Sequence, residues 1–401
     1  MSNRAALFRR GGPAATPARA CRSLWLVVWI VVLDVIVGGG WDAERHRTEP
    51  FDGFFSPPHL FIYGVALIAM ALTVRLLARP DLRRWFGPPV RLPAAVRDRL
   101  PWIEVPASLA LFAGGMAGIA VAGPIDAVWH TAFGLDETSW SVPHSMVGTS
   151  MLVLALGAVA GRLALAPHVP PRRWTVPALA LLVLFASLTL LGPLGNASPE
   201  VVRAMSGQGA LATDPDAQHT FRIYLRWNLT RTNPLFLVVG AAWAGYALAL
   251  LCRLLPRVVV WLPIVVIFAV LLDGGAAQEA EHLGVGQDTV TRIGLPLLCA
   301  AVPLFLSRRR GYPWPAFAAA GGLFAAAAYA LSVAGSAPVA GLLAVLVAPV
   351  AAVAGGYAGR ATRDAVQAPT GRRAALVLAA LLIAWPLGTG AIDLVLRTVT
   401  P

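Results

Sequence analysis

Eleven apolar stretches, each close to the length of a membrane-spanning helix, restrict what this chain can fold into. A helix needs roughly 20 apolar residues to cross a bilayer. Hydrophobic residues make up 57% of the 401 positions, charged residues 13%, and the mean hydropathy is +0.69. We therefore predict an all-α, polytopic integral membrane bundle of about eleven transmembrane helices. The stretches are residues 23–41, 59–79, 102–123, 143–165, 174–193, 234–253, 257–273, 291–307, 315–334, 338–358 and 374–394.

The basic residues predict the orientation of this bundle. All 32 are arginines, and 24 of them fall on one side of the membrane if the N-terminus is cytoplasmic. This is the bias that the positive-inside rule describes. The chain is therefore expected in a bacterial cell (inner) membrane, with the lipid bilayer as its main partner. The net charge of +12 is then explained by insertion and anionic lipid, and no nucleic acid is implied.

The predicted spans divide the chain into three parts. Residues 1–22 form a basic cytoplasmic tail, followed by a retained first helix because no small-residue cleavage site ends the apolar run. Residues 23–165 form two helical hairpins, 23–79 and 102–165, and residues 174–401 form the remaining bundle with an outer loop at 194–233.

The two hairpins carry the same polar pattern, which makes them an internal repeat. In each, an Asp is followed four residues later by a His, and a second His stands directly after proline beyond a loop. The chain has seven histidines, and four of them belong to this repeat. The residues are Asp42, His46 and His59 in the first copy and Asp126, His130 and His144 in the second.

The spacing of this pattern predicts two metal sites on the outer face. Residues at i and i+4 project from one side of a helix, so each Asp can reach an ion together with the His that follows it. Prolines 57, 58 and 143 suit the first turn of the returning helix, which places the second His beside them. Two imidazoles and one carboxylate suit non-haem iron, and imidazole-rich sites equally suit copper or zinc.

The motif resembles one in a known family, the C subunit of the copper-dependent particulate methane and ammonia monooxygenases. That subunit carries an Asp-x3-His-x12-His metal motif, and the second copy here contains its Asp-x-x-Trp-His portion as Asp126, Trp129 and His130. The family motif ends in Asp-x-x-Phe-Thr-Pro-x-His. The first copy matches this portion with Asp52, Phe55, Ser56, Pro57 and His59.

The resemblance implies that both Asp/His/His sets are metal ligands, that the ion is copper, and that the chain works beside partner subunits. It covers one short segment in each hairpin. The family has one motif per C subunit, whereas this chain has two and no soluble copper-binding domain. These differences suggest a distant relative or a duplicated offshoot of the family, from which monooxygenase activity does not follow.

Four other residues are weaker candidates for a site. Glu279 and His282 follow the seventh predicted helix, and His219 lies in the long outer loop. Two interpretations suit the segment from Asp273 to His282. It supplies a third set of metal ligands, or it is a solvated loop whose carboxylates cap helices. Asp34 lies inside the first apolar stretch, where a carboxylate is expensive and often functional, as in a proton relay. In a straight helix Asp34 is rotated roughly 80° from Asp42.

Three functions remain open from sequence alone. The first is a copper protein that oxidises a small or lipid-soluble substrate, with electrons from a partner or a quinol, since no haem, flavin or dinucleotide motif occurs. The second is metal transport or handling, although no ligand ladder beyond Asp34 crosses the bilayer. The third is a structural subunit whose His/Asp pairs only join the hairpins.

Overall fold

The computed structural model describes residues 16–48, 55–90, 104–133, 141–191, 234–255, 257–284, 292–334 and 342–399. These residues form helices and their connections. The one β-type contact among them is an isolated bridge between Pro89 and Pro106. The predicted all-α fold is therefore confirmed for the described part of the chain.

The helices follow the apolar stretches along the chain. The N-terminal group comprises α1 (Pro17–Leu33), the π-helical turn η1 (Asp34–Gly38), α2 (Gly39–Thr48), α3 (Pro57–Ala78), α4 (Pro80–Arg83), η2 (Arg84–Phe86), α6 (Ala107–Phe133) and α7 (Val142–Leu165). The others are α8 (Thr175–Ser187), η3 (Leu188–Leu191), α12 (Pro234–Leu254), α13 (Val258–Leu283), α14 (Gly294–Ser307), η4 (Arg308–Arg310), α15 (Trp314–Ala334), α16 (Leu342–Gln367), α17 (Gly371–Ala379), η5 (Ala380–Ala384) and α18 (Trp385–Val399).

Nine helices in the described residues are long and apolar enough to cross a membrane, judged by length and composition. Two of the eleven predicted stretches form shorter helices, at Thr175–Leu191 and Gly294–Ser307. The first helix begins at Pro17, inside the predicted tail, because Thr16 caps it by accepting a hydrogen bond from the Arg19 amide at 3.3 Å.

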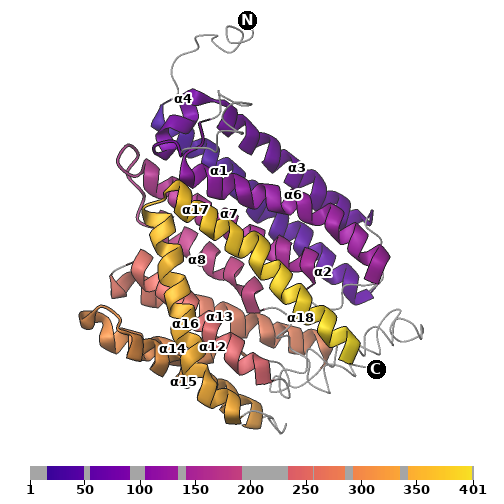
Figure 1. Cartoon of the computed structure of the whole chain (residues 1–401), viewed down its shortest axis with the longest axis vertical. Helices are drawn as coiled ribbons and strands as arrows, with labels where there is room; N and C mark the ends of the chain where they lie inside the picture. Colours follow the sequence, from indigo (N-terminus) through magenta and orange to yellow (C-terminus); the bar gives the residue numbers. More distant parts are fainter. Residues whose placement is uncertain are drawn as a thin grey trace, which may run out of the picture.

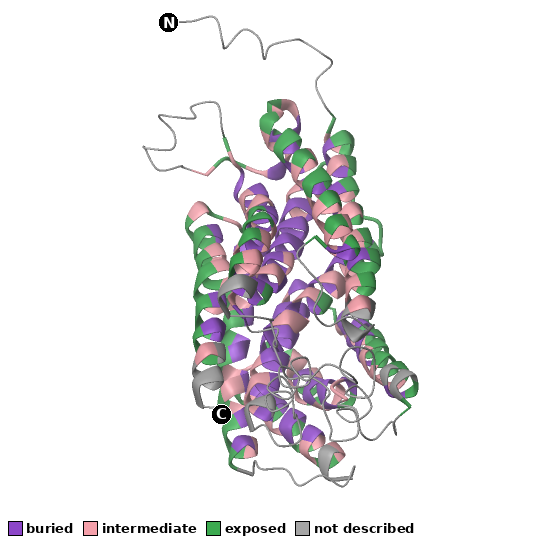
Figure 2. Cartoon of the chain, turned by 90° about the vertical axis from the view of Figure 1, so that its right-hand side faces the viewer, coloured by how far each residue is buried: buried purple, intermediate pink, exposed green. Residues whose placement is uncertain are grey.

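The outer surface of the bundle is apolar, as a lipid-facing surface should be. Large side chains such as Ile36, Val350 and Leu343 are 67%, 69% and 74% exposed. Figure 2 shows the exposed positions on the outside of the helices and the buried ones between them. Exposed apolar area of this extent is rare in soluble monomers.

Glycines allow the two closest helix pairs to form. A Cβ at Gly115 of α6 would lie 2.6 Å from the Leu154 amide nitrogen of α7, closer than real Cβ atoms approach. In the C-terminal half, a Cβ at Gly355 of α16 would collide with the Ala242 carbonyl oxygen of α12. Small residues bring backbones together in this way in membrane helices, where packing rather than hydrophobicity drives association.

The last helices return to the first half of the molecule. Figure 1 shows α17 and α18 lying across α6 and α7, while α12 to α16 form the other side. The Ser145 and Thr389 hydroxyls share a buried 2.7 Å hydrogen bond between α7 and α18. The start of α7, where His144 of the second motif lies, is therefore supported by the C-terminal segment.

Candidate metal centre

The first motif lies where the outgoing and returning helices of the first hairpin meet. Asp42 is in the first turn of α2, and His46 follows one turn later on the same helix. The return helix α3 begins at Pro57, so His59 lies in its first turn, as the prolines predicted. The side chain of His46 lies outside the described residues.

The structure brings Asp42 and His59 into direct contact. Asp42 Oδ1 lies 3.0 Å from His59 Nε2, and the two side chains are 25% and 14% exposed. Two aromatic pairs flank this contact: Trp41 with Phe61, whose ring centroids are 6.4 Å apart, and His59 with Tyr63, at 5.9 Å. The pair is thus half-buried, between helices that the chain connects through residues 49–54.

The distance between these two atoms is that of an ordinary ion pair, and it is also compatible with two ligands of one ion. Ligand atoms bound at about 2.0–2.2 Å and separated by a right angle lie about 3 Å apart. The Asp42–His59 distance of 3.0 Å agrees with that value. His46 stands one turn from Asp42 on the same helix, where a third ligand would have to be. Among the residues the structure describes, no group of three or more His, Cys, Asp or Glu side chains is close enough to hold a metal.

The second motif lies at the corresponding ends of α6 and α7. Asp126 is half-buried on α6, and Trp129, one turn later, is 7% exposed. His144 is exposed in the first turn of α7, where its amide donates to Ser141 Oγ at 3.4 Å. Pro143 occupies the start of this helix, as predicted. The His130 side chain is not among the described ones.

Tyr63 of the first hairpin packs against α6 of the second hairpin, which the sequence did not predict. A Cβ at Gly123 of α6 would lie 3.6 Å from Tyr63 Cε1, so the ring rests against the α6 backbone one turn before Asp126. The same ring neighbours His59. The only signal in the sequence was the aromatic start of the return helix, which does not specify a neighbour.

Asp34 opens the π-helical turn η1 within the first span. Its Oδ1 is buried and has no hydrogen-bond partner among the described residues. A π-helical turn takes up one extra residue, which removes about 100° of rotation and leaves Asp34 and Asp42 about 20° apart around the helix. The straight-helix value of roughly 80° therefore does not apply.

The other weak candidates lie mostly outside the described residues. The side chains of Glu279 and His282 are undescribed, and His219 lies in the undescribed segment 192–233. The segment after Asp273 is helical rather than a loop, because α13 continues to Leu283 and ends at Gly284 in the left-handed conformation. Asp273 caps α14, accepting hydrogen bonds from the amides of Gly294 at 2.8 Å and Leu295 at 3.0 Å.

Comparisons of the chain with models of protein families, with curated proteins and with solved structures found no match.

Proposed function

We propose that this chain is an integral membrane metalloprotein with one metal site in each hairpin. The observation that carries the proposal is the 3.0 Å contact between Asp42 and His59, residues that stand on different helices of the same motif. The proposed ligands are Asp42, His46 and His59 in the first site and Asp126, His130 and His144 in the second. Copper is the proposed ion, with iron and zinc as alternatives for the same donors.

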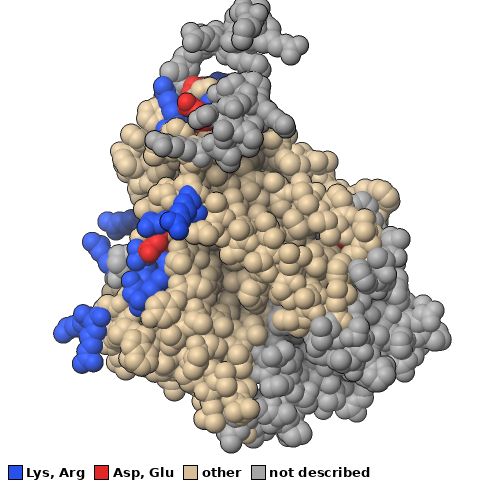
Figure 3. Space-filling view, viewed as in Figure 1, with Lys and Arg blue, Asp and Glu red and all other residues tan. Residues whose placement is uncertain are grey.

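The proposed topology places both sites on the extracytoplasmic side of a bacterial inner membrane. It retains eleven transmembrane helices and a cytoplasmic N-terminus. Its support is the distribution of arginine: in Figure 3 the blue side chains gather along one edge of the molecule. This edge includes the end of α12 and the start of α17, whereas both motifs lie at the opposite helix ends.

The chain's own residues suggest what each site would do. Asp42 and His59 would hold the ion between the hairpin helices, and Tyr63 would fix the His59 ring. Asp34 would exchange protons along the face of the first helix that carries Asp42, since intramembrane carboxylates commonly serve this role. Bound copper would supply one-electron chemistry for the oxidation of a small or lipid-soluble substrate. Electrons would come from a partner subunit or a quinol.

A structural role is the second candidate, and the same contact supports it. A half-buried ion pair between a carboxylate and an imidazole stabilises a hairpin without any metal. Metal transport has no comparable observation in its favour among the described residues.

Electron paramagnetic resonance of the Cu(II)-loaded, detergent-purified protein separates the first two candidates. We expect hyperfine coupling from imidazole nitrogens in the wild type, and fewer coupled nitrogens in His59→Ala. His168→Ala is the matched control, because His168 is exposed just beyond the end of α7 and its ring lies beside Trp85, with ring centroids 4.9 Å apart. If all three proteins give the spectrum of weakly bound copper, the structural role is the better account.

A further inference from the structure

Four arginines line a cavity at the helix ends opposite the two motifs. The cavity has a volume of about 450 Å³ and lies between the end of α12, the start of α13, the turn after α14 and the end of α16. This volume is typical of small-ligand sites. The lining includes Arg253, Arg308, Arg309 and Arg363.

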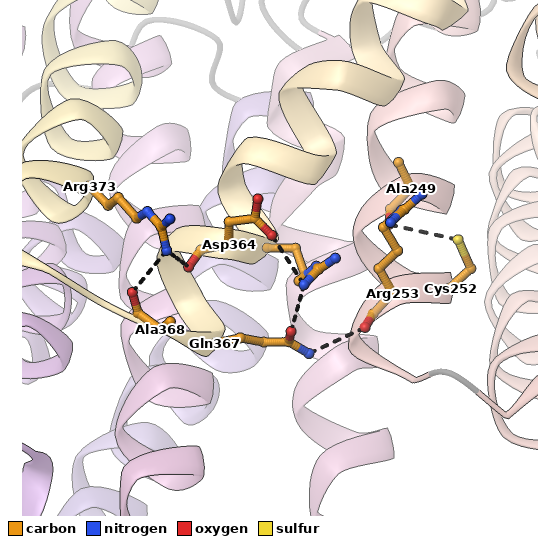
Figure 4. A network of polar contacts seen from close by, with 8 residues as sticks. Ala249, Cys252, Arg253, Asp364, Gln367, Ala368 and Arg373 are labelled. Atoms are coloured by element: carbon orange, nitrogen blue, oxygen red, sulfur yellow. Dashed lines mark hydrogen bonds and ion pairs between the residues drawn. The ribbon is translucent and has the colours of Figure 1, made fainter. Parts of the chain in front are cut away.

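The charge of this cavity is almost entirely positive. No described residue lining it is acidic. Among the described residues, Asp364 pairs with a lining arginine: its Oδ1 lies 3.1 Å from Arg363 Nη1. Figure 4 shows Asp364 beside Arg253, Gln367 and Arg373. Guanidinium groups keep their charge at any physiological pH, so their mutual repulsion favours an anion in the cavity.

Besides the ion pair between Arg363 and Asp364, neutral acceptors hold the lining arginines in place. Arg253 Nη2 donates to the Gly311 carbonyl at 3.0 Å. Arg363 Nη1 donates to Gln367 Oε1 at 2.8 Å, and Gln367 Nε2 donates to the Arg253 carbonyl at 3.2 Å. These bonds join α12, α16 and the turn after α14, and they are drawn in part in Figure 4. The positive groups are therefore positioned before any ligand arrives, which reduces the cost of binding.

Several donors in this cluster have no acceptor among the residues that the structure describes. The Nε atoms of Arg253 and Arg363 are buried and lack a hydrogen-bond partner among the described residues. The Nε of Arg360 is in the same condition, although its Nη2 donates to the Tyr312 carbonyl at 2.5 Å. A buried donor without a partner is costly. A phosphate group can accept two parallel hydrogen bonds from one guanidinium group, and these bonds are strong because both groups are charged.

The turn that presents Arg308 and Arg309 is strained. Gly311 and Tyr312 both have positive φ, of 72° and 58°. A tyrosine rarely adopts this conformation, and such strain is concentrated at ligand sites. Trp261 Nε1 donates to the Tyr312 hydroxyl at 3.3 Å, which holds the residue in place.

We propose that this cavity binds a phosphate group, carried either by an anionic phospholipid headgroup or by a soluble phosphate. Arginine pockets between membrane helices on the cytoplasmic side bind such headgroups in other proteins. The proposal is independent of the metal sites, which lie at the opposite helix ends.

Two pairs of substitutions with equal charge test this site. Arg309→Gln with Arg363→Gln removes two lining arginines. Arg310→Gln with Arg173→Gln removes two exposed arginines that do not line the cavity. Arg309→Gln alone provides a milder variant, because Arg309 is exposed and its loss should not affect folding.

The lipid arm counts phosphatidylglycerol bound to each protein by native mass spectrometry, with phosphatidylcholine as the neutral lipid. The soluble arm titrates inorganic pyrophosphate at constant ionic strength in a neutral detergent. We expect binding in one arm, about tenfold weaker in the lining pair and unchanged in the control pair.

The arm that shows this difference identifies the source of the phosphate. Equal loss in both pairs would mean diffuse charge rather than a site. That result, or no binding in either arm, would overturn the proposal.

Discussion

The contact between Asp42 and His59 makes a quantitative prediction in a double-mutant cycle of Asp42→Ala, His59→Phe and both together. The Phe ring keeps the packing against Tyr63. Exposed ion pairs contribute about 0.2–1 kcal/mol and hydrogen bonds to charged groups about 1.5–3 kcal/mol. With side chains 25% and 14% exposed, the pair lies between these limits. In metal-free protein we therefore expect a coupling energy of about 1–2 kcal/mol.

Copper should increase this coupling if the two residues share an ion. At a free concentration 100 times the dissociation constant, binding stabilises the fold by about 2.7 kcal/mol. Each single variant loses the whole stabilisation by copper, because it lacks one ligand. The double variant also loses this stabilisation, but no more of it than either single variant does. The coupling energy should therefore rise by about 2.7 kcal/mol, to about 4 kcal/mol.

The assay is reversible unfolding in mixed micelles, followed by tryptophan fluorescence with copper and with chelator. The Arg79–Asp81 ion pair, at 2.8 Å, serves as the control because it lies after α3, at the opposite helix end. Its coupling should not depend on copper. If the Asp42–His59 coupling is the same with and without metal, the argument that they are joint ligands fails.

Three further predictions concern the fold. Gly355→Ala should destabilise the protein by about 1–3 kcal/mol, because the added Cβ would meet the Ala242 carbonyl. Gly388→Ala is the control and should not destabilise it, because the space around Gly388 is open. Equal thermal midpoints for the Gly355→Ala and Gly388→Ala proteins would contradict this. Asp273→Ala should lower the free energy of unfolding by about 1 kcal/mol. It should also speed hydrogen exchange at the α14 amides of Gly294 and Leu295, from which Asp273 accepts hydrogen bonds. Unchanged exchange at these amides would show that Asp273 does not cap α14. Arg79 lowers the pKa of the Asp81 carboxyl below its usual range through a hydrogen bond. This pair therefore contributes stability above the unfolded pKa of about 3.9 and loses it as the pH falls through the lower folded pKa. The contribution is well under about 1 kcal/mol because the pair is partly exposed. The difference in melting temperature between wild type and Asp81→Asn, measured from pH 3 to 6, should shrink toward the acid end; a constant difference would contradict the assignment.

The sequence predicted the parts of the fold that depend on local chemistry. Pro57 and Pro143 marked the starts of α3 and α7, and the hairpin pattern placed Asp42 near His59. The π-helical turn at Asp34 was not predicted; it lies where α1 and η1 pack against α3, with Gly38 close to Ile62.

Contacts between segments far apart in the chain could not be predicted from the sequence either. The seventh stretch was expected to end at residue 273, yet α13 continues to Leu283. Asp273 instead accepts a hydrogen bond from the Gly294 amide at the start of α14, a contact between distant segments. The arginine cavity joins residues from 253 to 363 that the positive-inside rule treats only as a bias in charge.

The central claim is that the repeated Asp/His/His motifs bind metal, and elemental analysis of the purified protein tests it most directly. Copper, iron and zinc are offered in turn to the wild type, His46→Ala, His130→Ala and the control His168→Ala. We expect about two equivalents of one metal in the wild type and the control, and about one in each motif variant. No retained metal in the wild type, with the motif variants merely less stable, would contradict it.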